Sequence, residues 1–169
     1  MNDAPAVRVY LSLGSNINPR QHLKAALDAL HETFGDLTLS RVYESQAVGF
    51  SGDNFYNLVV GLECALSVGQ LLKCLRAIED DNARDRSGPK FSARTLDIDI
   101  LTYGDLVGEI DGIALPRDEI LKYAFVLIPL ADIASDERHP VLRETYGNLV
   151  KKMDIRRQPL WPVAFPWGS

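Results

Sequence analysis

Residues 94–101 read Arg94-Thr95-Leu96-Asp97-Ile98-Asp99-Ile100-Leu101. Aliphatic and β-branched residues alternate here with polar ones, which is typical of a β-strand with one buried face. Side chains alternate across a strand, so Asp97 and Asp99 share one face, about 7 Å apart at about 3.3 Å per residue. The opposite face carries three apolar side chains that we expect to enter a core, namely Leu96, Ile98 and Ile100.

Two carboxylates so close together on a half-buried surface are costly unless a cation lies between them. A hard divalent ion such as Mg²⁺ takes oxygen ligands and often carries phosphate oxygens as well. We therefore expect Asp97 and Asp99 to be metal ligands. Taken alone, however, an Asp-x-Asp pair on an exposed strand face is more often plain solvated surface.

The segment before this strand, residues 84–94, is basic. It contains four cationic residues and one acid among Ser, Gly and Pro; the cations are Arg84, Arg86, Lys90 and Arg94. Guanidinium groups are suited to bidentate contact with phosphate. Metal-binding carboxylates beside a basic loop indicate phosphoryl or pyrophosphoryl transfer. The alternative is a solvated charged loop, which is the commoner meaning of a short run of charges.

The rest of the first hundred residues makes this strand the last of a β-α-β-β-α-β order. Alternating patterns predict strands over 7–13, 37–44 and 55–66, and helical stripes follow Asn18 and Ser67. Both helices offer a capping box, Asn18 with Gln21 and Ser67 with Gln70. This order predicts an α+β, ferredoxin-like fold, a mainly antiparallel sheet packed with helices.

The residues after this unit predict additions to the fold. Glycines in 104–115 indicate short hairpin strands, and we expect helices near 118–123 and 141–150. The tail from Pro159 to Trp167 is rich in proline and aromatic residues, so we expect extended chain packed against the body.

Length and composition are those of one globular domain over residues 1–169. The net charge of −5 and a pI near 5.2 argue against general nucleic-acid binding. There is no apolar run long enough to cross a membrane and no visible signal peptide, so we expect a cytoplasmic protein. Cys64 and Cys74 lack metal or redox spacing and are interpreted as buried thiols.

In order and spacing, several segments of the chain resemble the 6-hydroxymethyl-7,8-dihydropterin pyrophosphokinase family of folate biosynthesis. The resemblance implies transfer of pyrophosphate from ATP to the pterin hydroxymethyl group, with AMP as co-product, two Mg²⁺ ions and a monomeric protein. The matching segments are Leu11-Ser12-Leu13-Gly14-Ser15-Asn16, Val42-Tyr43-Glu44-Ser45, Asn54-Phe55-Tyr56-Asn57, Ile78-Glu79, Arg84-Asp85-Arg86, residues 94–101, Leu115-Pro116 and residues 124–130.

The resemblance also implies roles for individual residues. The catalytic set is Arg84, Arg94, Asp97 and Asp99, with the two aspartates as metal ligands. The pterin-binding set is Ser45, Gln46, Val48, Phe55, Asn57, Phe91, Asp97 and Phe125, in which Phe55 and Phe125 stack on the pterin and Asn57 recognises its edge. The ATP-binding set is Glu79, Arg84, Arg86, Lys90, Arg94, Ile98 and Arg117. On composition alone, each Phe fits a plain core and Glu79 fits a surface charge at a helix end.

The chain departs from the family pattern on the nucleotide side. Arg117 stands where many members have His, Tyr123 where an arginine often contacts ATP, and Gly112 and Ala114 where polar residues are common. These changes motivate one alternative, a non-catalytic pterin-binding paralogue. A second alternative, a metal-dependent nucleic-acid enzyme, is disfavoured by the acidic pI.

Overall fold

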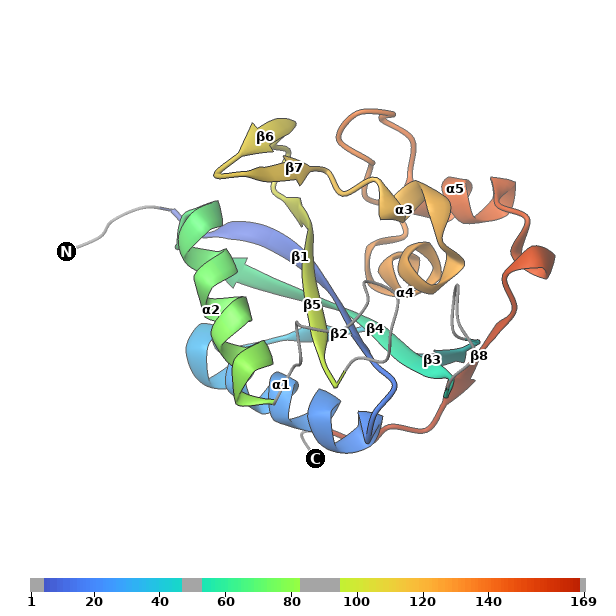
Figure 1. Ribbon diagram of the computed structural model, residues 1–169. Coiled ribbons are helices and arrows are strands. Elements are labelled where there is room, and N and C mark those ends of the chain that lie inside the picture. Colours follow the sequence, from blue (N-terminus) through green and yellow to red (C-terminus); the bar gives the residue numbers. More distant parts are fainter. Residues whose placement is uncertain (1–4, 47–52, 83–94, 168–169) are drawn as a thin grey trace.

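A computed structural model describes residues 5–46, 53–82 and 95–167 (Figure 1). The first part of the chain forms β1 (Val7–Ser15), α1 (Pro19–Phe34), β2 (Thr38–Leu39), β3 (Val42–Ser45), β4 (Phe55–Cys64), α2 (Val68–Asp81) and β5 (Asp97–Tyr103). The remainder forms β6 (Gly108–Ile110), β7 (Ile113–Leu115), α3 (Glu119–Lys122), α4 (Ala124–Ala134), α5 (Tyr146–Lys152), a 3₁₀ turn (Ile155–Arg157) and β8 (Leu160–Val163).

The main sheet confirms the ferredoxin-like fold. Its strands lie in the order β5-β1-β4-β3-β8, each pairing antiparallel with its neighbour, and β2 also pairs with β4. The expected strand over 37–44 is in fact two short strands. Ser40 separates them because its hydroxyl accepts the N–H of Val59, so a side chain replaces a backbone partner there. β6 and β7 form the expected hairpin.

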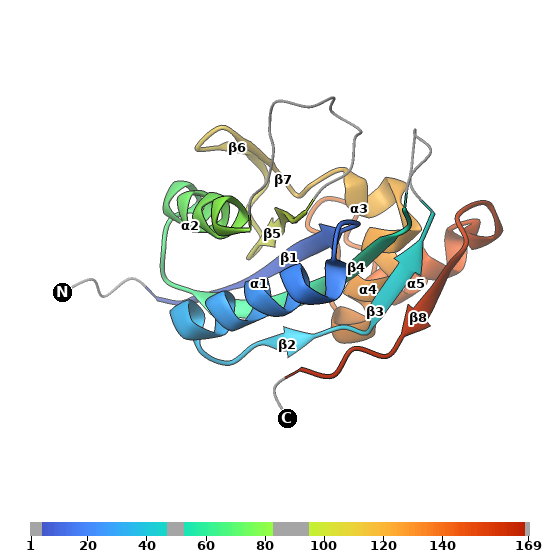
Figure 2. The same ribbon diagram turned by 60° about the horizontal axis from the view of Figure 1, so that its bottom comes forward.

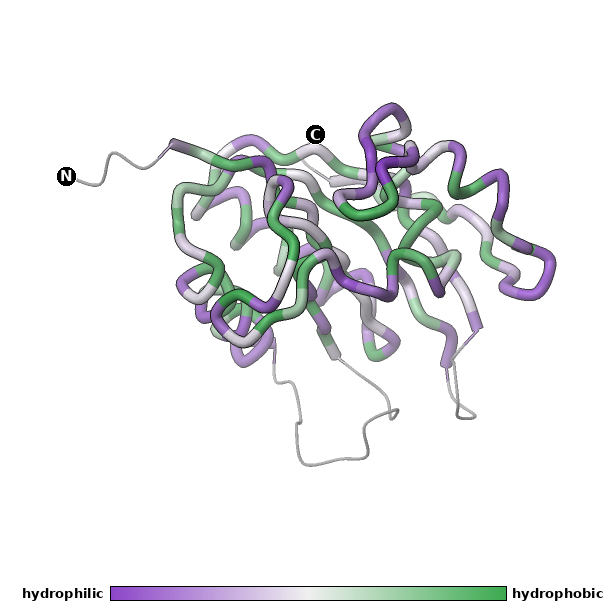
Figure 3. Tube along the Cα trace, turned by 90° about the horizontal axis from the view of Figure 1, so that it is seen from above, coloured by the Kyte–Doolittle hydropathy of each residue, from purple (hydrophilic) through white to green (hydrophobic). Residues whose placement is uncertain are grey.

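Helices cover both faces of the sheet (Figure 2). The face toward α1 and α2 buries Val9, Leu11 and Leu13 of β1. The other face packs Tyr10 and Leu101 against α4 and its neighbours. Hydrophobic residues concentrate along the central strands and helices in Figure 3, whereas the peripheral turns are hydrophilic. The two carboxylates of β5 therefore belong to a face that a helix partly covers.

The two predicted capping boxes have different outcomes. The second is confirmed, since Ser67 accepts the N–H of Gln70 and the Gln70 side chain accepts the N–H of Ser67. The first is wrong. Asn18 has a left-handed backbone, with φ 45° and ψ 53°, and its side chain makes no capping hydrogen bond. Pro19 does open the helix, as predicted.

The last helix begins later than the sequence indicated, at Tyr146 rather than near residue 141. The ring of buried His139 accepts the backbone N–H groups of the residues at 141 and 142, which holds that segment in a turn. Thr145 then caps the helix by accepting the N–H of Asn148. A buried side chain thus overrides the local helical pattern.

The C-terminal tail packs against the body, as expected, and β8 also joins the sheet through antiparallel pairing with β3. Further on, Arg20 of α1 donates to the carbonyl of Ala164 over 2.6 Å. The indole of Trp167 donates to Asp28 over 2.8 Å. Among the described residues, none of the helices has the length and apolar character needed to cross a membrane.

Candidate active site

Strand β5 holds Asp97 and Asp99 beside β1, where they pair in register with Gly14 and Ser12. Both aspartates are half-buried, whereas Ile98 between them is fully buried in the core facing α1 and α2. The predicted alternation is confirmed: the carboxylates lie on one face of the strand and the aliphatic side chains on the other.

The carboxylate pair lies in an electrostatically strained setting. Burial raises the pKa of Asp99 to about 7, and the negative charge of Asp97 adds to this rise. The positive charge of Arg117 opposes this rise in the pKa of Asp99, and its guanidinium nitrogen lies 3.7 Å from Asp99 Oδ1. The same guanidinium lies 2.8 Å from Glu119 Oε1, so its charge is shared between two carboxylates. The site consequently favours a further cation.

The donor set fits Mg²⁺ in particular. Mg²⁺ is commonly bound through one or two carboxylates together with substrate phosphates and water, rather than by an all-protein cage. In the part of the chain that the structure describes, no group of three or more His, Cys, Asp or Glu side chains is arranged to hold a metal. Asp97 and Asp99 are therefore suited to an ion that arrives with phosphate oxygens.

Glu79 of α2 holds β5 from the opposite face. It is fully buried, so the alternative interpretation as a surface charge is wrong. Its carboxylate accepts the backbone N–H of Ile98 at 2.8 Å and a hydrogen bond from Arg76 at 2.9 Å. Arg76 also donates to the carbonyl of Ile98. Helix α2 thus fixes both peptide units that lie between the two aspartates.

Asn57 of β4 lies in the same row of the sheet as Asp97, with Gly14 between them. It is 6% exposed, and its Oδ1 has no hydrogen-bond partner among the described residues. A buried acceptor without a partner is costly, so this oxygen points to a ligand that donates a hydrogen bond. The role of Asn57 at the pterin edge stays a prediction.

A cavity of about 160 Å³ lies between the end of β3, the start of α4 and the segment that leads into β8. It brings together three predicted pterin-binding residues, Ser45, Gln46 and Phe125. Phe55 pairs with Ser45 across β4 and β3. Four further lining residues were missed by sequence reasoning, namely Arg157, Gln158, Pro159 and Leu160. The tail from Pro159 to Trp167 was expected to pack on the body, but nothing local indicated where, and Arg157 and Gln158 lie before that tail.

The other predicted site residues divide into two groups. Ile98 directs its side chain into the core, and Arg117 lies beside Asp99. Val48 and the residues of the basic segment lie outside the described residues, namely Arg84, Arg86, Lys90, Phe91 and Arg94.

Comparisons with known proteins match most of this chain to one family. A family model described as 7,8-dihydro-6-hydroxymethylpterin-pyrophosphokinase matches residues 10–135. The 2-amino-4-hydroxy-6-hydroxymethyldihydropteridine pyrophosphokinase of Pseudomonas aeruginosa is 40% identical over 138 residues, which is 79% of this chain and 84% of the relative. The enzyme of that name from Synechocystis is 34% identical over 163 residues, covering 91% of this chain and 79% of the relative.

Solved structures support the fold. The wild-type HPPK-DHPS of Plasmodium falciparum superposes with a TM-score of 0.68 at 14% identity. The match covers 90% of this chain but only 45% of the solved chain, so this chain spans less than half of that protein.

Proposed function

Because this chain belongs to the 7,8-dihydro-6-hydroxymethylpterin-pyrophosphokinase family, its reaction is pyrophosphoryl transfer in folate biosynthesis, and we propose that it uses ATP with two Mg²⁺ ions. The acceptor is the hydroxymethyl group of 6-hydroxymethyl-7,8-dihydropterin, and the products are the pterin diphosphate and AMP. No finding favours the non-catalytic alternative.

In this proposal, Asp97 and Asp99 bind the metal, and Arg117 contacts the ATP phosphates. Asp97 and Asp99 would hold Mg²⁺, and the bound ion would supply neutralisation of phosphate charge and orientation of the β-phosphorus for in-line attack. Glu79 and Ile98 would act indirectly, because they set the course of β5 from its opposite face. The remaining ATP contacts would come from the basic segment that includes Arg84, Arg86, Lys90 and Arg94. We assign no strong general base, because positioning and electrostatics carry most of the rate in a loose transition state.

The pterin binds, in this proposal, between the rings of Phe55 and Phe125 with its edge toward Asn57. Ser45 at the end of β3 and the following residues Gln46 and Val48 contact the heterocycle, and Phe91 does so from the basic segment. Asp97 of β5 and Asn57 of β4 both pair with Gly14 of β1, so they lie two strands apart in one row of the sheet. The proposal is carried by this shared row, which contains both the amide that would read the pterin and the carboxylate that would bind the metal.

The test measures AMP formation from Mg·ATP with and without 6-hydroxymethyl-7,8-dihydropterin. Wild type should form AMP only with the pterin, and Asp97→Asn and Asp99→Asn should lose turnover while melting cooperatively. Asp36→Asn removes an exposed carboxylate elsewhere and should retain activity. A folded wild-type protein that binds the pterin but forms no AMP would refute the proposal in favour of the non-catalytic paralogue.

We further propose that residues 1–169 act as one catalytic unit, that the protein is monomeric and cytoplasmic, and that it has no nucleic-acid or membrane partner. The pairing of β8 with β3 supports the first point, because it ties the end of the chain to the strand that leads into the site.

A further inference from the structure

Gln158, which follows the 3₁₀ turn, joins two helices through its side-chain amide. Its Oε1 accepts the N–H of Ala124 at 2.8 Å, and its Nε2 donates to the carbonyl of Lys122 at 3.1 Å. Lys122 ends α3 and Ala124 begins α4. The amide therefore bonds the peptide groups on both sides of Tyr123, from a position 34 residues further along the chain.

The hydrogen bond from the Ala124 N–H to Gln158 satisfies a backbone group at the start of α4. The first N–H groups of a helix have no intrahelical partner. At the N-cap of α4 stands Tyr123, whose side chain makes no capping hydrogen bond. Gln158 supplies the missing acceptor and uses its other end for the last carbonyl of α3. A carboxamide offers a donor and an acceptor on two atoms of one planar group, which suits this pair of bonds.

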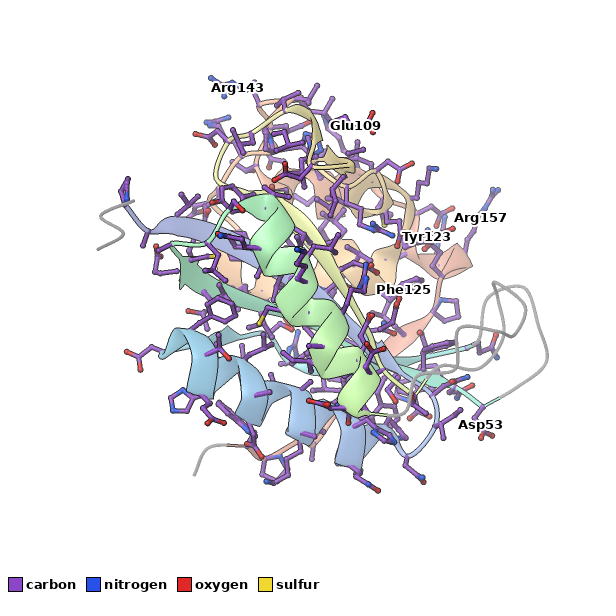
Figure 4. The ribbon with its side chains drawn as sticks, turned by 60° about the vertical axis from the view of Figure 1, so that its left-hand side comes forward. Asp53, Glu109, Tyr123, Phe125, Arg143 and Arg157 are labelled. Atoms are coloured by element: carbon purple, nitrogen blue, oxygen red, sulfur yellow. The ribbon has the colours of Figure 1, made fainter. Side chains whose placement is uncertain are left out.

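Tyr123 in turn supports Phe125. The two rings are stacked, with centroids 4.9 Å apart and planes inclined by 15° (Figure 4). Phe125 lines the cavity that Gln158 and its neighbours also line. Clamping the peptide groups on either side of Tyr123 fixes the direction of its Cα–Cβ bond, and the stack with Phe125 then restricts the planes of both rings.

We propose that Gln158 is a positioning residue of the pterin site, which acts through Tyr123 to hold Phe125 in the plane that stacks on a flat aromatic heterocycle. This inference rests on the proposed function, which assigns Phe125 to the pterin. It adds two residues, Gln158 and Tyr123, from outside the predicted pterin-binding set. In particular, it gives a role to Tyr123, one of the departures from the family pattern.

The decisive variants separate the clamp from the stack. Gln158→Met is nearly isosteric and removes both hydrogen bonds, whereas Gln158→Glu keeps the acceptor for Ala124 and loses the donor. Tyr123→Leu removes the stack and leaves the amide bonds in place. Tyr123→Phe retains the stack and serves as the conservative rescue. Arg156→Gln changes an exposed neighbour, with a side chain 92% exposed, and is the matched control.

The readouts are the pterin Kd by calorimetry with 6-hydroxymethylpterin, and KM for pterin and ATP with kcat where turnover occurs. We expect Gln158→Met and Tyr123→Leu to weaken pterin binding two- to tenfold, the range that an aromatic stacking contact supports. Gln158→Glu should lie between Gln158→Met and wild type. For Gln158→Met, Gln158→Glu and Tyr123→Leu, KM for ATP should stay within twofold of the wild-type value. For Tyr123→Phe and Arg156→Gln, every readout should stay within twofold of wild type.

The outcomes also separate this inference from the proposed function. If wild type is active while Gln158→Met and Tyr123→Leu bind the pterin with unchanged Kd, the positioning role is wrong and the function stands. If Gln158 only stabilises the fold, Gln158→Met should lower Tm while Tyr123→Leu binds the pterin with unchanged Kd. That result would also overturn the positioning role. A wild type that binds pterin without turnover contradicts the function, and weaker binding by both variants still supports the inference.

Discussion

Replacing Gly14 by alanine tests the row of side chains at the centre of the site. A Cβ at position 14 would lie 2.7 Å from Asn57 Nδ2, whereas ordinary contacts of this kind begin near 3.4 Å. The backbone of Gly14 does not have a positive φ, so alanine introduces no backbone strain there. The whole effect of the substitution should therefore come from the collision with Asn57.

The expected cost follows from overpacking. Forcing a buried side chain to move in a packed site costs about 1–3 kcal/mol. For a chain of this size, each kcal/mol lowers Tm by about 2–4 °C, so Gly14→Ala should lower Tm by about 2–12 °C. Because Asn57 must rotate away from its present position, pterin affinity should fall as well.

A double-mutant cycle identifies the cause. Asn57→Ala removes the colliding amide together with an acceptor that has no partner among the described residues, so by itself it should change stability by no more than about 1 kcal/mol. In that background Gly14→Ala should be nearly neutral, which gives a coupling energy of about 1–3 kcal/mol between the two sites. Thermal or urea unfolding of the four proteins measures it. Additive effects, with the same Tm loss in both backgrounds, would refute this reasoning.

Three further predictions concern stability. Glu79→Leu strands the N–H of Ile98 and should lower the free energy of unfolding by about 1–3 kcal/mol, while substitution of exposed Asp36 should not. Burial lowers the pKa of His139, so its contribution to stability should be lost as pH falls from 7 through that pKa, and His139→Asn should lose less stability than wild type over this range in urea unfolding. The raised pKa of Asp99, about 7, contributes with the opposite sign: without metal, its contribution should be lost as pH rises from 5 to 8, so the stability of Asp99→Asn should rise relative to wild type over this range. An unchanged slope in either variant would contradict its assignment.

Features that depend on short-range pattern could be predicted from the sequence. The alternation through residues 94–101 correctly placed both carboxylates on one face, because side-chain direction in a strand depends only on position. The capping box of Ser67 and Gln70 was predicted for the same reason, since its hydrogen bonds join residues three apart. The β-α-β-β-α-β order then determined the sheet, because few arrangements of that order bury every apolar face.

Some residues form side-chain hydrogen bonds to segments that their local sequence pattern does not specify. For these residues, only the tertiary structure decided the role. Ser40 divides a predicted strand by accepting from Val59, and His139 delays a helix by holding a turn. Glu79 is a buried support for β5 rather than a surface charge, because β5 and Arg76 together satisfy its carboxylate. Gln158 reaches the site from the C-terminal tail. Local periodicity records which face of an element is apolar, but a polar side chain's role is set by the partner that compensates its burial, and that partner is chosen only when the chain has folded.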